Sequence, residues 1–350
     1  QLVLPRNYMS VSQLQKYNNC PYSYFASYLL RLHERETWEP SAREQGSILH
    51  AMMELSLSEL ITRLQTVVGD EQKTSVTADW QRSLSREKIE AVFEAALANE
   101  GLNHFDFPET RGQMKQRIVR YAATSLLLTG EQARRDKLFP REVEWRFPQP
   151  GQDNFALQAD DWQVTLRGTI DRIDTGEDGF ALIDYKRGSK KVSYADIVTG
   201  TNLQLPLYLK VYRHLYPEAV PRGFGYFTFK DQRSDNRKGI SPVTSAAVDL
   251  LKDAFDKQKS AEDPEMLSVI SDYSAARANK TMHSILGGDI SARPTVIRSQ
   301  QSPCSYCLLK AHCLYDGRTD RDSVQTRERE KELEENALRE IMKWQSEREY

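Results

Sequence analysis

Apolar residues in the first half of the chain recur at spacings of three and four, with charged residues between them. This is the pattern of helices with one buried face, and it predicts helices over residues 43–64, 86–98 and 112–134. Ahead of them, Ser10-Val-Ser-Gln13 has the form of a capping box and predicts the start of a short helix. Cys20-Pro21 interrupts that helix, so Cys20 is expected near a helix junction.

From Arg141 onward the pattern changes to strict alternation, which indicates strands. The alternating runs cover Val143 to Phe147, Phe155 to Leu157, Val164 to Ile170 and Phe180 to Asp184, with a turn at residues 175–179. Further predictions are a helix over 201–216, a strand over 223–229 and a helix over 244–259. Together these elements predict an α/β (α+β) fold in which helices flank a mixed sheet.

The chain has 350 residues, 39% of them hydrophobic, and a net charge of −2. It can therefore bury a large core, whereas no apolar run is long enough to cross a bilayer. The first ten residues lack the basic and apolar regions of a secretory signal, so we expect a cytoplasmic protein without a membrane partner. Because the first residue is Gln1, we also expect a piece of a longer polypeptide.

The expected organisation is a single domain over residues 1–320, followed by a charged segment over 321–350. Within the domain we expect a helical insert over 64–135, a core over 140–260 and a cysteine-bearing segment over 300–315. Residues 327–350 carry many charges of both signs, which is typical of a solvated terminal helix or a tail.

Candidate chemistry lies in the predicted sheet. Asp171 ends one alternating run, and Asp184 and Lys186 lie two residues apart on the next strand, so their side chains share a face. Two carboxylates brought together repel each other, and Mg²⁺ or Mn²⁺ relieves this repulsion while leaving positions open for water and phosphate. Such an arrangement suits phosphodiester hydrolysis, with a lysine to orient the water. A salt bridge at an exposed strand end is the alternative interpretation.

Two further groups accompany these residues. Gly46 and His50 lie on the first long helix, where Gly46 permits close backbone approach and the imidazole offers a nitrogen ligand. Gln204 and Tyr208 lie one turn apart on a later helix and suit contacts with phosphates or bases. Ordinary helix packing is the alternative for each group.

The chain has four cysteines, Cys20 and the trio Cys304, Cys307 and Cys313. Three thiols this close in a reducing compartment favour a metal site over disulfides. Four thiolates suit an iron–sulfur cluster or a structural zinc ion, and a shared site would join the two ends of the chain. Four unrelated buried thiols are the alternative.

Taken in order, Gly46 to His50, Asp171, Asp184-Tyr-Lys186 and Gln204 to Tyr208 resemble the RecB-like branch of the PD-(D/E)XK nuclease superfamily. The resemblance implies that His50, Asp171, Asp184 and the Tyr185 carbonyl bind the catalytic metal. It implies that Lys186 assists the attacking water. Glu54, one turn beyond His50, is a further candidate.

The cysteine spacing resembles the four-cysteine [4Fe-4S] site of cluster-bearing members of this branch. The segment Ser10 to Tyr28, the core motif and the cysteines are most similar to the C-terminal nuclease module of AddB-type helicase-nuclease subunits. This resemblance implies a DNA exonuclease acting in double-strand break repair and recombination on single-stranded ends, supplied by a helicase partner. Arg187, Lys190 and Lys191 are candidate contacts to the strand.

The chain lacks a phosphate-binding Gly-x-x-x-x-Gly-Lys-Ser/Thr loop, so we expect no ATPase activity of its own. Three other functions remain open at this point. They are a stand-alone nuclease of the CRISPR-adaptation type, a DNA-end-binding scaffold without catalysis, and an iron–sulfur sensor.

Overall fold

The computed structural model describes residues 8–32, 42–102, 108–186, 193–229, 264–297, 302–307, 309–313, 315–316, 325–326 and 330–348. Within these residues the α-helices are α1 (Val11–Asn19), α2 (Pro21–Tyr24), α3 (Ala42–Leu64), α4 (Asp70–Arg82), α5 (Arg86–Asn99), α6 (Pro108–Asp136), α7 (Tyr194–Thr199), α8 (Gln204–Leu215), α10 (Pro264–Leu286), α11 (Lys310–Cys313) and α12 (Glu330–Ser346). A π-helix spans Phe25–Leu29 and a 3-10 helix spans Pro303–Tyr306. The strands are β1 (Tyr8–Ser10), β2 (Phe139–Phe147), β3 (Ala156–Ala159), β4 (Trp162–Gly176), β5 (Gly179–Lys186), β6 (Pro221–Thr228), β7 (Val296–Ile297) and β8 (Gln325–Thr326).

The predicted elements are largely present. The capping box at Ser10 forms in full, because Ser10 Oγ accepts from the Gln13 amide at 3.3 Å and Gln13 Oε1 accepts from the Ser10 amide at 2.8 Å. The periodicity did not reveal α4, α7 or α10. The predicted helix over 244–259 lies outside the described residues. No helix in the described part of the chain is both long and apolar enough to span a membrane.

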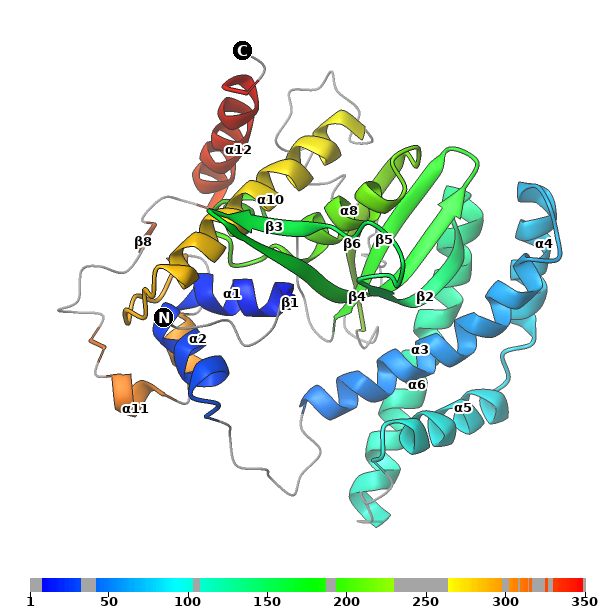
Figure 1. Cartoon of the computed structure of the whole chain (residues 1–350). Coiled ribbons are helices and arrows are strands. Elements are labelled where there is room, and N and C mark those ends of the chain that lie inside the picture. The colour runs from blue at the N-terminus through cyan, green and yellow to red at the C-terminus, as the bar shows by residue number, and fades with distance from the viewer. Residues whose placement is uncertain are drawn as a thin grey trace.

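A mixed six-stranded sheet forms the centre of the fold, as predicted (Figure 1). The long strand β4 organises it: its first half pairs with β1 and β3, and its second half pairs with β2 and β5. β6 then pairs in parallel with β5. The β4–β5 hairpin turns tightly at Gly176 and Gly179, where a Cβ would lie 2.2 Å from the carbonyl oxygens of Lys137 and Val220, respectively.

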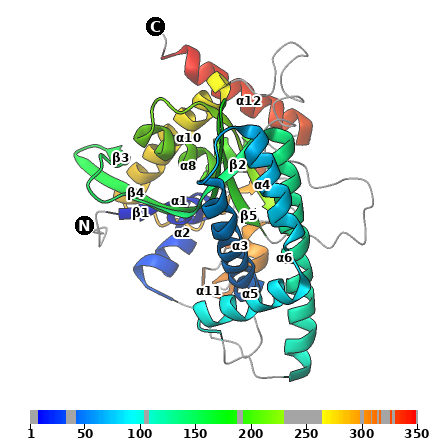
Figure 2. The same ribbon diagram turned by 90° about the vertical axis from the view of Figure 1, so that its right-hand side faces the viewer.

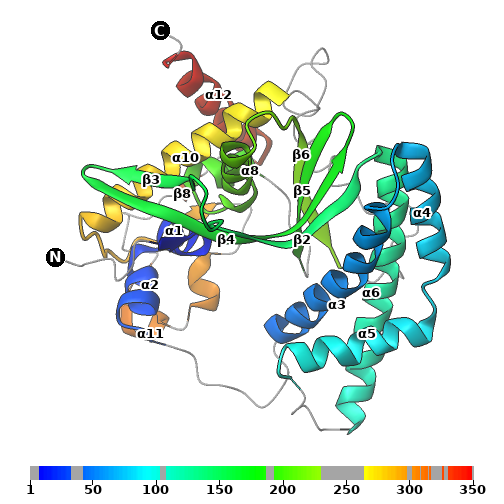
Figure 3. The same ribbon diagram turned by 45° about the vertical axis from the view of Figure 1, so that its right-hand side comes forward.

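Helices cover both faces of the sheet, and each face has its own apolar core. Helices α1, α8, α10 and α12 cover one face, and the helical insert α3, α5 and α6 covers the other (Figures 2 and 3). Strand β5 contributes alternately to both cores: Phe180 and Leu182 pack on the α8 side, whereas Ile183 and Tyr185 pack on the α3 side. The strand that carries the candidate site is therefore held from both sides.

A buried arginine joins the helical insert to the sheet. Arg172 of β4 is fully buried, and its Nε lies 2.9 Å from Oδ1 of Asp174. Its Nη1 donates to Thr129 Oγ1 on α6 at 3.0 Å, and the guanidinium lies over the ring of Tyr185. Burial raises the pKa of Asp174 to about 6, although Arg172 opposes this shift. The pair is therefore costly to desolvate and depends on its complete set of contacts.

The charged C-terminal segment differs from the solvated helix or tail that was predicted. It forms α12, whose residues Leu333, Leu338 and Ile341 are buried in the core on the α8 side. Glu334 Oε2 accepts from the amide of Tyr194 at 2.7 Å, and its Oε1 accepts from the hydroxyl of Ser193. The carboxylate thus caps the start of α7. Apolar residues hidden among the many charges supply the buried face.

We expect Asp174→Ala to lower the free energy of unfolding by about 3–5 kcal/mol, because it leaves the Arg172 charge buried without its partner. The matched control is Asp178→Ala, which removes an aspartate that is 84% exposed and 3.7 Å from Arg222. The control should cost less than about 1 kcal/mol. Urea denaturation measures both values, and equal effects would contradict a structural role for the buried pair.

Truncation of Ile341, which is 0% exposed, tests how firmly α12 is docked. We expect Ile341→Ala to cost about 2–5 kcal/mol, because the side chain leaves a cavity in the core. Arg339→Ala, on the exposed face of the same helix, should change stability by no more than about 0.5 kcal/mol. Thermal denaturation of the two variants side by side would reject the docking if their melting temperatures were the same.

Candidate functional site

The two residues at the end of β5 form an ion pair, hereafter the Asp–Lys pair. Lys186 Nζ lies 2.5 Å from Asp184 Oδ2, and the Asp184 side chain is only 1% exposed. Gln204 Nε2 of α8 donates to the other oxygen, Asp184 Oδ1. The shared face predicted from the spacing of the two residues is therefore present, and a third residue from the predicted set contacts them.

Helix α3 brings His50 to the neighbouring part of the sheet. His50 Nδ1 lies 3.5 Å from Asp171 Oδ2, and His50 Nε2 lies 3.1 Å from the carbonyl oxygen of Tyr185. The Tyr185 amide donates to Asp171 Oδ2 at 2.6 Å, which ties β5 to the carboxylate of β4. The structure thus gathers His50, Asp171 and the Tyr185 carbonyl around one point.

Glu144 of β2 is a member of the site that the sequence did not reveal. Its Oε1 lies 3.9 Å from His50 Nδ1, and ligand atoms of His50, Glu144 and Asp171 all lie within 4.8 Å of one another. We call these three residues the acid–histidine group. Their oxygen and nitrogen atoms could hold a metal ion. Asp184 is outside the group, since its oxygens are engaged by Lys186 and Gln204.

A backbone irregularity directs Glu144 into the site. Glu144 has φ of 48°, a left-handed conformation that costs of order 1–3 kcal/mol in a non-glycine residue. On either side of it, Val143 packs against the α3-side core and Trp145 against the α8-side core. The alternation predicted Val143, Trp145 and Phe147 on one face, so that prediction was wrong at Val143. The face changes at Glu144, which lies opposite Asp171 in the β2–β4 ladder.

Crowded acidic groups dominate the electrostatics of the site. Burial raises the pKa of Asp171 well above its usual range, and the charge of Asp184 raises it further. Burial also raises the pKa of Glu144 to about 7, with a second contribution from Glu54. The pKa of His50 falls to about 4, first through burial and then through the Lys186 cation. A neutral imidazole beside poorly solvated carboxyl groups is the state that a cation can bind.

The remaining predicted site residues occupy varied positions. Tyr208 is 6% exposed, and its hydroxyl accepts from Gln204 Nε2 at 3.3 Å, so it supports the amide that holds Asp184. Glu54 lies near enough to raise the Glu144 pKa. No described atom lies within 4 Å of a Cβ placed on Gly46, so the close approach expected there is absent from the described residues. The basic residues Arg187, Lys190 and Lys191 lie outside the described residues.

The four cysteines come together although the sequence separates them widely. Cys20, Cys304, Cys307 and Cys313 all line one cavity of about 370 Å³, which we call the cysteine cavity. Each thiol is free and half-buried. Cys20 stands at the junction of α1 and α2, and the other three lie on or beside the 3-10 helix and α11. Burial raises the pKa of Cys20, and the nearby Cys304 and Cys307 add to that shift.

Curated proteins similar to this chain share one description, the B-type subunit of an ATP-dependent helicase/deoxyribonuclease. That of Desulforamulus reducens is 26% identical over 361 residues, which cover 88% of this chain and 30% of that protein. That of Clostridium acetobutylicum is 25% identical, with the same coverage of each. That of Carboxydothermus hydrogenoformans is 30% identical over 68% of this chain and 22% of that protein. The chain thus spans less than a third of the length of these relatives.

The sequence profile of one family matches nearly the whole described fold. This is the PD-(D/E)XK nuclease superfamily, matched over residues 8–314. The match includes the acid–histidine group, the Asp–Lys pair and the mixed sheet that carries them, and it confirms the resemblance seen in the sequence. The chain therefore belongs to the PD-(D/E)XK nuclease superfamily.

Proposed function

We propose that this chain is the nuclease module of a helicase-nuclease and hydrolyses phosphodiester bonds at DNA ends with Mg²⁺ or Mn²⁺. The observation that carries the proposal is the contact between two sets of residues. The acid–histidine group lies beside the Asp–Lys pair, linked by the Tyr185 amide, which donates to Asp171 from between Asp184 and Lys186. A cation site next to an ammonium group suits attack on a phosphate.

The residues present fit a hard divalent cation. Asp171, Asp184 and Glu144 repel one another in a poorly solvated place, which is why the pKa values of Asp171 and Glu144 are raised. We assign His50, Asp171, Asp184 and the Tyr185 carbonyl as the metal ligands and add Glu144 as a further acidic ligand. When bound, the cation would polarise the phosphate and stabilise charge on the leaving oxygen.

The side chains around this position have distinct roles in the proposed reaction. Lys186 orients the attacking water and offsets negative charge on the phosphate, while it also balances Asp184 before substrate binds. Gln204 fixes the Asp184 carboxylate, and Tyr208 fixes Gln204. Burial keeps His50 neutral, so that its ring nitrogens stay available as ligands.

The substrate and partner follow from the relatives and remain part of the proposal. The similar proteins are named as subunits of an ATP-dependent helicase/deoxyribonuclease, which supports DNA as substrate and a helicase as partner. A helicase would deliver single strands, and Arg187, Lys190 and Lys191 are positioned in the sequence to follow their phosphates directly after Lys186. We place this activity in the cytoplasm, in double-strand break repair and recombination.

Replacing Lys186 by alanine tests the catalytic assignment. Anaerobically purified chain is incubated with short end-labelled single-stranded DNA, which needs no unwinding, with and without Mg²⁺ or Mn²⁺. We expect cleavage that requires the cation and falls at least about 100-fold in Lys186→Ala, the size typical of a lost charge-stabilising group. Lys343→Ala, on the exposed side of α12, is the matched control and should cleave at the wild-type rate.

The outcomes separate the alternatives. Cleavage by Lys186→Ala at the wild-type rate would refute the role of Lys186. Binding of the labelled DNA by the wild-type chain without cleavage under either cation would refute the nuclease and favour an end-binding scaffold.

We further propose that the cysteine cavity holds a [4Fe-4S] cluster that acts as a structural staple. All four thiols line one cavity, and a four-thiolate donor set suits such a cluster. The same donor set also suits zinc, which is the less favoured alternative. Because Cys20 is far from the other three in sequence, any shared ion or cluster would tie the start of the described chain to residues beyond 300.

Removing one thiol tests the staple. We expect the anaerobically purified wild type to contain about four iron and four sulfide per chain, as a [4Fe-4S] cluster requires. Cys307→Ser should lose the iron and melt at a lower temperature, because the link between the two chain segments is broken. Ser305→Ala, an exposed neighbour on the same 3-10 helix, should keep both. Zinc in place of iron, or an unchanged melting temperature after loss of iron, would contradict the proposal.

A further inference from the structure

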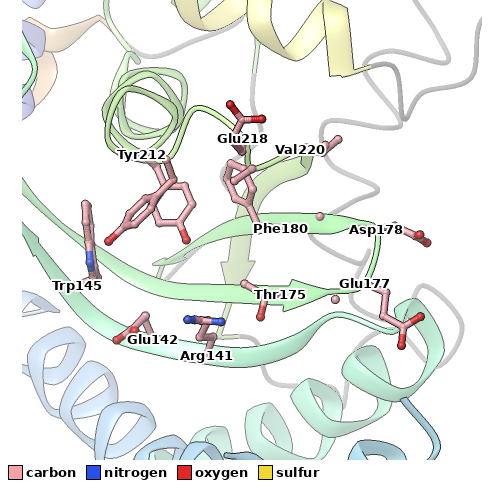
Figure 4. A pocket seen from close by; sticks show the side chains of 14 residues that line it. Arg141, Glu142, Trp145, Thr175, Glu177, Asp178, Phe180, Tyr212, Glu218 and Val220 are labelled. Atoms are coloured by element: carbon pink, nitrogen blue, oxygen red, sulfur yellow. The ribbon is translucent and has the colours of Figure 1, made fainter. Parts of the chain in front are cut away.

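A second cavity lies on the α8 side of the sheet, away from the Asp–Lys pair. It has a volume of about 540 Å³ and is lined by β2, by the turn of the β4–β5 hairpin and by the end of α8 with the loop that follows it (Figure 4). We call it the aromatic cavity. Phe180 lines it at the start of β5, whereas Lys186 ends the strand, about 20 Å away along an extended chain. The proposed nuclease reaction leaves this cavity without a role.

Aromatic rings form one wall of the cavity. The ring centroids of Trp145 and Tyr212 lie 5.6 Å apart, those of Tyr212 and Tyr216 lie 4.7 Å apart, and those of Phe180 and Tyr212 lie 4.6 Å apart. Figure 4 shows Trp145 and Tyr212 on the same side of the cavity, on different elements. Tyr216 is 39% exposed, so part of this wall is open to solvent. A planar cation can stack on such rings.

The rest of the lining is predominantly acidic. Glu142, Glu177, Asp178 and Glu218 line the cavity, and Arg141 is its only basic lining residue. Asp178 lies 3.7 Å from Arg222 just outside. Among the described residues, no cation lies within ion-pair distance of Glu142, Glu177 or Glu218. Carboxylates thus outnumber the arginines around the cavity, which disfavours a phosphate and attracts a cation.

From this combination we propose that the aromatic cavity binds an arginine side chain presented by a segment of a partner protein. A guanidinium stacks on an aromatic wall and at the same time donates to carboxylates, two requirements that a single arginine fulfils. The volume exceeds one side chain and accommodates the flanking peptide as well. This docking does not depend on the proposed nuclease reaction, because its residues are separate from the acid–histidine group and the Asp–Lys pair.

The test uses the full chain labelled with 5-fluorotryptophan, in which Trp145 is one of five tryptophans. Its fluorine signal is assigned with Trp145→Phe. The probe is the blocked pentapeptide Gly-Ser-Arg-Gly-Ser, and its control has citrulline, which is uncharged and has the same shape, in place of arginine. We expect the arginine peptide to shift the Trp145 signal in a saturable way and the citrulline peptide to leave it unchanged.

Two variants test the two halves of the cavity. We expect the double variant Glu177→Gln and Glu218→Gln to weaken binding about fivefold, because it removes two exposed charges. Tyr216→Ala should weaken it by a similar, about fivefold, factor through loss of a stacking ring. Asp161→Asn, in the exposed turn between β3 and β4, removes one charge elsewhere and should leave binding unchanged.

Three results would overturn the inference. The first is no saturable shift of Trp145 with the arginine peptide. The second is an equal shift with the citrulline peptide, which would show that charge is irrelevant. The third is a shift with an oligothymidylate and none with the arginine peptide, which would make the cavity a nucleic-acid site. None of these results bears on the cleavage that depends on Lys186, so failure here is distinguishable from failure of the proposed nuclease.

Discussion

The buried guanidinium of Arg172 is the interaction on which the rest of the structure depends. It lies between the two halves of the molecule, bound to Asp174 within β4 and to Thr129 on α6, and it faces the rings of Tyr185 and Phe227. Its neighbour in the chain is Asp171, and Tyr185 follows Asp184. One desolvated charge therefore fixes the spacing of the two strands at the point where the carboxylates meet. A loss of that charge would affect the site before it affected the remainder of the fold.

The site combines two kinds of stored cost. The backbone of Glu144 is held in a left-handed conformation, and the acidic groups around it are held close together with little solvent. Both costs are sustained because the sheet is packed from both faces. A folded chain that carries uncompensated carboxyl groups is poised to gain stability from a cation, so binding and folding free energies are linked here. This is a physical reason for such residues to lie on the most firmly held strands rather than on loops.

Much of this arrangement could be predicted from the sequence, because it depends on local patterns. The capping box at Ser10, the hairpin turn at Gly176 and Gly179, and the shared face of Asp184 and Lys186 follow from spacing alone. Glu144 could not be predicted, since its position results from a change of face that interrupts the period of two. The buried role of α12 was missed because its apolar residues are few among many charges, and the partner that they cover, α10, was also missed. The contact of Glu334 with Ser193 and Tyr194 depends on tertiary packing and leaves no local signal.

That contact has a consequence for how the protein forms. The amide of Tyr194 and the carboxylate of Glu334 are 140 residues apart in the chain. A ribosome makes the chain from its N-terminus at about 5–20 residues per second, so α7 waits at least several seconds for its cap. During that time the face of the sheet that α12 covers is open to water and to other chains. Completion of the fold is thus timed by the last helix of the described chain, and chaperone protection would matter most just before that helix emerges.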